Sequence, residues 1–498
     1  MDALSLARWQ FAIVTVYHFI FVPLTIGLAP LVALMQTRWV RTGDARWLKL
    51  TKFFGKLFLI NFALGVATGL VQEFQFGMNW SEYSRFVGDV FGAPLAMEAL
   101  AAFFIESTFL GLWIFGWDRL PKKLHLACIW LVAIAVNLSA FFILAANSWM
   151  QHPVGTVFNP ETGRAEMVDI VAVLTNVTHL AAFPHTVSGA FLTAGTFVAG
   201  VSAWWMVKLV RSGGQADREV ARDVYRPAIR MGVVTMFISG IALAVTGDWQ
   251  AKLMFEQQPM KMAAAEALCT GERGADFSLL SIGDLSNDCA GVKHVLRIPG
   301  FTSYLAKGDP NAYLPGIAEV QQQYAERYGD VGRDGEPVSY QPNLALTYWS
   351  FRLMIGLGAG SALLALVALW MTRKGRVSGS RWLARIALWS IPAPFLANSF
   401  GWIFTETGRQ PWVVVPNPTG IDAVRMLTER GVSTSVGPGL VILSMSVFTV
   451  LYAVLAWVWF RLMVRYAAEG VPEHVLDVAP DAASAAETSA EDPLSFAY

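Results

Sequence analysis

Long hydrophobic runs alternate along this chain with short polar linkers. Nine of the runs reach the roughly 20 residues that a helix needs to cross the hydrocarbon core of a bilayer. They cover residues 11–36, 53–76, 92–116, 124–146, 179–207, 228–250, 343–371, 383–405 and 438–464. The composition agrees, since 55% of the 498 residues are hydrophobic and only 15% are charged, against about 25% charged in soluble chains. The pattern predicts an all-α, polytopic membrane protein with nine transmembrane helices.

Lys and Arg are distributed unevenly among the linkers. The linkers rich in these residues alternate with linkers that are poor in them. The rich set is 37–52, 117–123, 208–230 and 373–381, and the poor set is 77–91, 147–178 and 406–437. Because basic linkers face the cytoplasm in most membrane proteins, the alternation predicts an N-terminus outside the cell and a cytoplasmic C-terminus.

This topology divides the chain into four parts. Residues 1–250 hold helices 1–6, residues 251–342 form an extracytoplasmic segment, residues 343–467 hold helices 7–9, and residues 468–498 form a cytoplasmic tail. The extracytoplasmic segment begins with a helical pattern, "QQPMKMAAAEAL". The tail is acidic and poor in core-forming residues, and we expect it to be disordered.

The three cysteines are too few for an iron–sulfur cluster held by four thiolates. Cys269 and Cys289 lie in the extracytoplasmic segment, where conditions are oxidising, so we predict a disulfide between them, with two free thiols as the alternative. Cys128 lies in a predicted span, where a thiol usually acts as a small core residue. The formal net charge of zero suggests no nucleic-acid partner.

Four potential metal ligands fall in the outer half of the predicted spans: His18, His185, Met354 and Glu406. Taken singly, each has an ordinary explanation, such as helix packing for the histidines and the methionine, or an interfacial ion pair for Glu406. Together they suggest a haem protein, because His and Met are the axial ligands of low-spin haem and a helix bundle can enclose the macrocycle.

Charged and aromatic residues accompany these candidates. Arg352 lies two positions before Met354 and could neutralise haem propionates, and Trp402 lies one helical turn before Glu406. Glu98 and Glu106 lie in the third span, where ionisable residues are costly and therefore suggest a function. The alternative for both glutamates is hydrogen bonding between neighbouring helices.

Six long segments resemble subunit I of the cytochrome bd-type quinol oxidases. They are "RWQFAIVTVYHFIFVPLTIGLAPL", "GAPLAMEALAAFFIESTFLGLWIFGWDRL", "NSWMQHPVG", "FPHTVSGAF", "YWSFRLMIG" and "ETGRQPW", and the likeness extends through nearly all nine spans. The extracytoplasmic segment resembles the short form of the quinol-binding loop of that family.

The resemblance implies three haems near the outer face, two of b type and one of d type. It implies that His185 and Met354 ligate the low-spin haem b. His18 and Glu406 would ligate the two high-spin haems. We assign His18 to haem d and Glu406 to high-spin haem b, and the reverse assignment stays open because members of the family differ.

The resemblance also implies roles for the surrounding residues. Arg352 and Arg409 would stabilise the haem groups electrostatically, and Trp402 would lie between haems. Lys261 and Glu266, in "KMAAAE", would bind the quinol, which is either ubiquinol or menaquinol.

The implied activity is oxidation of quinol at the outer face of a bacterial cell membrane and reduction of O2 to water, without a copper centre. Protons taken from the cytoplasm would pass Glu98 and Glu106, so that turnover generates a membrane potential. These two residues lie about 12 Å apart along a helix, so waters or other polar groups such as Ser107, Thr108 and Ser139 must complete the path. A second polytopic subunit would complete the enzyme, and small single-span subunits are compatible with it.

Three other classes fit the sequence less well. An ion-coupled transporter would favour internal repeats and broken helices at the midplane, whereas the polar residues here gather at the outer face. A haem–copper oxidase needs more histidines in its spans. A di-haem electron-transfer subunit would use paired histidines and would leave "GRQPW" without a role.

Overall fold

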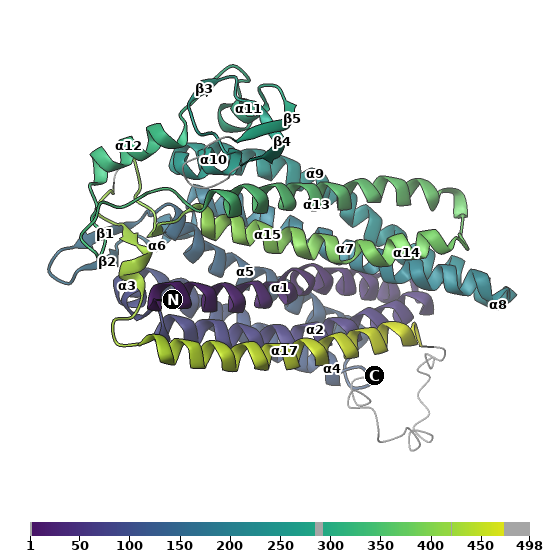
Figure 1. Ribbon diagram of the computed structural model, residues 1–498. Coiled ribbons are helices and arrows are strands. Elements are labelled where there is room, and N and C mark those ends of the chain that lie inside the picture. The colour runs from purple at the N-terminus through teal and green to yellow at the C-terminus, as the bar shows by residue number, and fades with distance from the viewer. Residues whose placement is uncertain (1, 284–291, 420, 473–498) are drawn as a thin grey trace.

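Long, nearly parallel helices make up most of the molecule, and a small mixed segment covers one end of them. The computed structural model describes residues 2–283, 292–419 and 421–472 (Figure 1). Within these residues, nine helical rods are long and apolar enough to cross a membrane. The predicted number of spans is therefore confirmed. The predicted orientation of the termini is not tested by the fold and stays a prediction.

Five of the nine spans are single helices: α1 (Ala3–Thr42), α2 (Ala45–Met78), α5 (Lys122–Gln151), α13 (Leu344–Met371) and α17 (Pro438–Glu469). The other four are composite. They are α3 (Ser81–Met97) with a π-helical segment (Glu98–Phe103) and α4 (Phe104–Phe115); α6 (Ile170–Leu174) with α7 (Val177–Ser212); α8 (Gln215–Val220) with a second π-helical segment (Ala221–Tyr225) and α9 (Arg226–Gln257); and α14 (Arg381–Ser390) with α15 (Pro392–Gly408).

Local sequence signals set several helix ends. The turn between α1 and α2 needs only two residues. Gly43 adopts a positive φ of 69° and closes α1, and the Asp44 carboxylate then accepts a hydrogen bond of 2.9 Å from the backbone N–H of Arg46. These are the usual C-terminal glycine and N-terminal carboxylate signals. Asn343 caps α13 in the same way, through a bond of 2.9 Å from Leu346 N.

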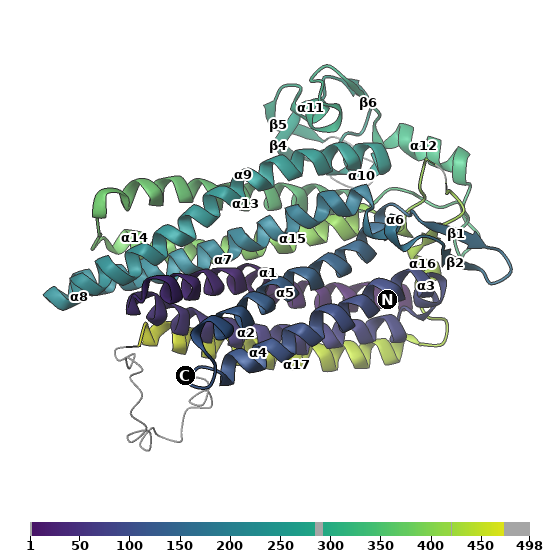
Figure 2. The same ribbon diagram turned by 180° about the vertical axis from the view of Figure 1, so that it is seen from behind.

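Small residues allow the central helices to approach closely. A Cβ atom on Gly27 of α1 would lie 2.4 Å from the Ala190 carbonyl oxygen of α7, and one on Gly195 of α7 would lie 2.7 Å from the Gly232 carbonyl oxygen of α9. Such small-residue contacts are the common way in which helices pack in membranes. Figure 2 shows α7 between its neighbours α9 and α5. The close contacts fix the heights of α1, α7 and α9 relative to one another.

The predicted extracytoplasmic segment forms the mixed part at one end of the bundle (Figure 1). It contains α10 (Pro259–Glu266), α11 (Phe301–Lys307) and α12 (Ile317–Tyr328), and the two-stranded sheets β3 (Glu272–Arg273) with β6 (Tyr313–Leu314) and β4 (Phe277–Ile282) with β5 (Lys293–Ile298). The predicted helical pattern is thus confirmed as α10. The same end carries the hairpin β1 (Thr156–Asn159) and β2 (Arg164–Met167), the pair β7 (Trp412–Val414) and β8 (Met426–Leu427), and α16 (Thr428–Gly431).

Several predicted linkers are largely helical. Only Gly43 and Asp44 separate the helices within 37–52, and most of 208–230 belongs to α7, α8 and α9. The predicted linker 77–91 is also mostly helical. Residues 81–91 belong to α3, because Tyr83, Val87 and Val90 bury one side of an amphipathic helix against the core, while the polar residues between them lower its mean hydropathy. The predicted tail lies almost wholly outside the described residues.

Candidate functional site

His18 lies on α1, and its ring is held in one tautomer by α2. The Thr68 hydroxyl donates its proton to the backbone of its own helix, at 2.9 Å from the Leu64 carbonyl oxygen. The same hydroxyl oxygen lies 2.9 Å from His18 Nδ1, and with its own proton used in the helix it accepts the Nδ1 proton. The Nε2 atom then carries the free lone pair, which is the state that binds a metal.

His185 lies on α7 and repeats this arrangement with α9. The Thr246 hydroxyl donates to the Ala242 carbonyl oxygen at 2.7 Å, and its oxygen lies 2.9 Å from His185 Nδ1. The Nε2 atom of His185 is therefore also available as an electron-pair donor. Neither threonine was predicted from the sequence.

Met354 lies at the height of His185, although the two residues come from helices far apart in sequence. A Cβ atom on Gly189 of α7 would lie 2.6 Å from Asn398 Oδ1 of α15, which fixes the relative height of these helices. His185 lies one turn from Gly189, and Gly401 lies one turn from Asn398 in the same direction along the bundle. A Cβ atom on Gly401 would lie 2.9 Å from Met354 Sδ. The two predicted ligands of the low-spin haem therefore share one level of the bundle.

Glu406 lies in the last turn of α15 and is surrounded by hydrogen-bond donors. Its carboxylate pairs with Arg409 and accepts a hydrogen bond of 3.1 Å from Asn147 Nδ2 of α5. Trp402, one turn earlier, stacks on Phe19, the residue after His18, with 5.1 Å between ring centroids. This contact places Trp402 between the Glu406 and His18 regions.

The buried donors in this region also suit a haem. The Nε and Nη1 atoms of Arg409 and the Nε1 atom of Trp402 are buried and have no hydrogen-bond partner in the described part of the chain. Buried N–H groups normally have an acceptor, and a haem propionate is an acceptor of the right charge for Arg409. The His and Met donors also match the known axial ligation of haem. The residues present therefore fit the expected group.

Glu98 and Glu106 lie on the same transmembrane helix, which changes from α-helical to π-helical geometry at Glu98. The π-helical segment begins at Glu98, and such segments frequently mark functional sites. Ser139 of α5 donates a hydrogen bond of 2.8 Å to Glu98, as the predicted involvement of this hydroxyl requires. Glu106 is buried, whereas the hydroxyl of Ser107 faces the exposed side and bonds to the Phe103 carbonyl oxygen at 2.8 Å.

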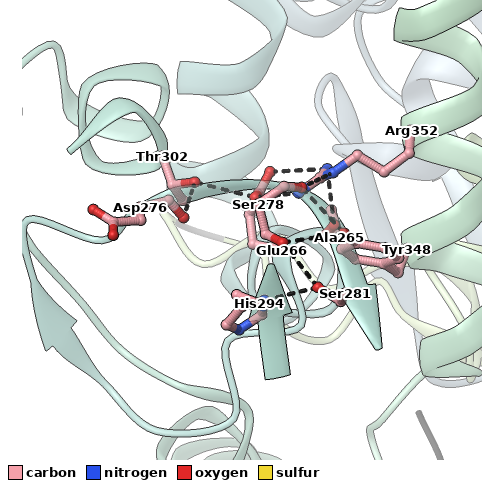
Figure 3. Close-up of polar contacts among 9 residues, drawn as sticks. All are labelled: Ala265, Glu266, Asp276, Ser278, Ser281, His294, Thr302, Tyr348 and Arg352. Atoms are coloured by element: carbon pink, nitrogen blue, oxygen red, sulfur yellow. Dashed lines mark hydrogen bonds and ion pairs between the residues drawn. The ribbon is translucent and has the colours of Figure 1, made fainter. Parts of the chain in front are cut away.

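Glu266 and Lys261 both lie on α10, but they contact different neighbours. The two residues are five positions apart, so their side chains point about 140° apart around the helix axis. Figure 3 shows Glu266 directed toward Arg352 of α13. The ion pair measures 2.6 Å, and the two side chains are 2% and 6% exposed. Burial raises the pKa of the Glu266 carboxyl, while Arg352 and the Thr302 hydroxyl, 3.1 Å away, act in the opposite direction.

Lys261 points toward the end of α15. Its Nζ atom lies 3.2 Å from the Thr405 carbonyl oxygen and 3.4 Å from Gln151 Oε1, and a Cβ atom on Gly408 would lie 2.9 Å from its side chain. Burial lowers the pKa of Lys261 to about 7; Glu406 opposes this shift and Arg409 adds to it. The two predicted quinol ligands therefore do not share one set of contacts, and α10 instead connects the Met354 region with the Glu406 region.

A hydrogen-bonded network joins Arg352 to the outer sheet (Figure 3). Arg352 Nε donates to the Ser278 carbonyl oxygen at 2.5 Å, and the guanidinium lies 4.5 Å from the centroid of the Tyr348 ring. The Ser278 hydroxyl lies 3.0 Å from that of Ser281, which lies 2.7 Å from His294 Nδ1. These contacts hold β4 and β5 against the end of α13.

The cysteines are only partly described. Cys128 is a buried free thiol, as expected for a core residue. The predicted disulfide involves Cys289, which lies outside the described residues, so the link to Cys269 stays a prediction.

Comparisons with known proteins agree in pointing to one family. The family model described as cytochrome bd terminal oxidase subunit I matches residues 6–471. The chain is 44% identical over 476 residues to the cytochrome bd ubiquinol oxidase subunit 1 of Bacillus subtilis (strain 168), covering 95% of both chains. It is 39% identical over 463 residues to the cytochrome bd-II ubiquinol oxidase subunit 1 of Escherichia coli (strain K12), covering 83% of this chain and 88% of that one. The structure of bd oxidase from Geobacillus thermodenitrificans superimposes with a TM-score of 0.78 at 26% identity, covering 94% of this chain and 99% of that chain.

Proposed function

Because the chain belongs to the cytochrome bd terminal oxidase subunit I family, we propose that it is the haem-bearing subunit of a quinol:O2 oxidoreductase in a bacterial cell membrane. The observation that carries the proposal is the pair of half-buried histidines, His18 and His185, each with Nδ1 bonded to a threonine hydroxyl and Nε2 left for a ligand. Met354 and Glu406 lie at the same end of the bundle, so the four side chains can hold the family's haems b and d close together.

Each predicted ligand has a distinct task. His185 and Met354 would hold the low-spin haem b, and His18 and Glu406 would hold haem d and the high-spin haem b, with the reverse order as the alternative. When bound, the haems carry electrons and supply the iron at which oxygen is reduced. Arg409, whose Nε and Nη1 atoms need an acceptor, neutralises a propionate.

Quinol is oxidised at the α10 segment. Glu266 and Thr302 line a closed crevice together with Met262 and Ala263, with about 0 Å³ open to a water molecule. A quinol hydroxyl could donate a proton to the Glu266 carboxylate once this segment opens. Arg352 fixes that carboxylate by the 2.6 Å ion pair and lies two residues before Met354. This connection would give electrons a route from the quinol to the low-spin haem. Lys261 is the second predicted quinol contact.

Protons for oxygen reduction enter from the opposite end of the bundle. Reduction of one O2 to two waters consumes four electrons and four protons. Glu106 and Glu98 can pass protons along the third span, and the Ser139 hydroxyl at 2.8 Å extends the route to α5. Asn147, which bonds to Glu406, lies two turns further along α5, about 12 Å away. With quinol protons released outside, this uptake makes turnover electrogenic, and a second polytopic subunit completes the enzyme.

The test is quinol-driven oxygen consumption by the complex purified with its second subunit. We expect His185→Ala to abolish turnover with loss of the low-spin haem. His179→Asn is the control: His179 lies on the same helix and is fully buried, but its Nδ1 bonds to the Leu174 carbonyl oxygen at 2.8 Å, and an Asn amide can replace that donor. Full turnover in the His185→Ala variant would overturn the proposed site.

A further inference from the structure

A Thr-Gly pair faces each of the two candidate haem-binding histidines. Thr68 and Gly69 lie on α2 opposite His18, and Thr246 and Gly247 lie on α9 opposite His185. In both cases the pair comes from the next long helix along the chain, at sequence separations of 50 and 61 residues. The same arrangement of a Thr-Gly pair against a histidine therefore occurs twice in the bundle.

Adjacent residues of the pair contact adjacent atoms of the ring. The threonine oxygen lies 2.9 Å from Nδ1 in both sites. A Cβ atom on the glycine would lie closest to Cε1, the ring atom between Nδ1 and Nε2, at 3.1 Å for Gly69 and 3.4 Å for Gly247. The glycine backbone therefore supports the edge of the imidazole beside the atom that must reach the iron.

The threonine also determines which nitrogen carries the proton. Its hydroxyl proton is used within its own helix, at 2.9 Å from the Leu64 carbonyl oxygen for Thr68 and 2.7 Å from the Ala242 carbonyl oxygen for Thr246. With its proton used in this way, the oxygen accepts from the ring, which favours the tautomer with its proton on Nδ1. Groups that bond to the second nitrogen of a ligating histidine fix its tautomer and orientation.

We propose that Thr68 and Thr246 are positioning residues that hold His18 and His185 in the metal-binding tautomer, and that the following glycine supports the ring. The inference rests on the proposed function, because it takes both histidines as haem ligands. The acceptor is a neutral hydroxyl and not a carboxylate, so it orients the ring without adding negative charge beside it. Such a site suits a haem that must accept electrons from quinol.

The test compares Thr246→Val with Thr246→Ser in the purified complex. Valine keeps the shape but removes the acceptor. We expect low-spin haem affinity to fall about 10–100-fold, as when other groups bonded to a ligating histidine are removed, with a shifted midpoint potential in the haem that remains. Serine restores the acceptor and should restore both readouts. Thr235→Val is the control, because this α9 hydroxyl bonds only to the Met231 carbonyl oxygen of its own helix, at 2.9 Å.

The outcomes separate the two proposals. If His185→Ala loses the low-spin haem but Thr246→Val leaves its affinity and potential unchanged, the positioning role is overturned and the proposed function stands. If both variants keep a normal low-spin haem, the ligand assignment itself fails. At the other site, Thr68→Val should perturb a high-spin haem in the same way, and Gly69→Ala should be less well tolerated than Gly247→Ala because its Cβ lies closer to the ring.

Discussion

Replacing Glu266 by Gln should loosen α10 from the end of α13. The change leaves the Arg352 charge buried without its carboxylate, in a place where both side chains are nearly inaccessible to solvent. Breaking a buried ion pair from one side costs about 3–5 kcal/mol. Arg352 retains bonds to the Ser278 carbonyl oxygen at 2.5 Å and the Ala265 carbonyl oxygen at 3.3 Å, so we expect the lower end. About 3 kcal/mol corresponds to a roughly 100-fold shift of the docking equilibrium.

Hydrogen–deuterium exchange measures this shift directly, because protection reports the free energy of local opening. Amides of residues 259–282 should exchange about 100-fold faster in Glu266→Gln. They should be unchanged in the control Glu256→Gln, whose side chain is exposed. The double variant with Arg352→Met should be less destabilised than the sum of the single changes, since no unpaired charge remains. Unchanged protection in Glu266→Gln, or strictly additive effects, would refute the reasoning.

Three further predictions follow from the site. Met354→Leu should keep the fold but lose the low-spin haem spectrum, because leucine fills the space without a sulfur ligand; a normal low-spin spectrum would contradict this. Glu106→Gln should slow oxygen consumption while haem content stays normal, because an amide cannot carry the proton, whereas Ser107→Ala, on the exposed side of the same helix, should leave the rate unchanged. Burial lowers the pKa of His294, so the Ser281–His294 contact should be fully stable above about pH 6.5 and weaken as the pH falls through the folded-state pKa. Exchange of the β4–β5 amides at pH 7.5 and 5.5, corrected for intrinsic rates, should show this, and His294→Gln should remove it.

The spans were predictable because each must bury its own backbone in lipid, which requires a long apolar run that is visible in the sequence. The start of α3 could not be predicted, because an amphipathic helix at the end of the bundle carries too many polar residues to be recognised by hydropathy. Burial of Tyr83 and Val87 supplies the stability there, and burial depends on neighbours distant in sequence.

The candidate ligands were predictable as unusual residues at one depth, but the groups that orient them were not. Thr68 and Thr246 are ordinary residues of membrane helices, and their role arises only when helices 50 or more residues apart pack together. A Thr-Gly dipeptide occurs in both "VATGL" and "AVTGD", but it also occurs at five other places in the chain, so the sequence alone did not single out these two. The separate contacts of Lys261 and Glu266 likewise depend on how α10 docks, which no local pattern specifies.

The most direct test of the account is the haem content of the purified complex, measured with its reduced-minus-oxidised spectrum. The account predicts two haems b and one haem d for each copy of this chain. It also predicts that the low-spin b signal is the one lost in both His185→Ala and Met354→Leu. A purified complex without haem d, or a low-spin signal that survives both substitutions, would contradict it.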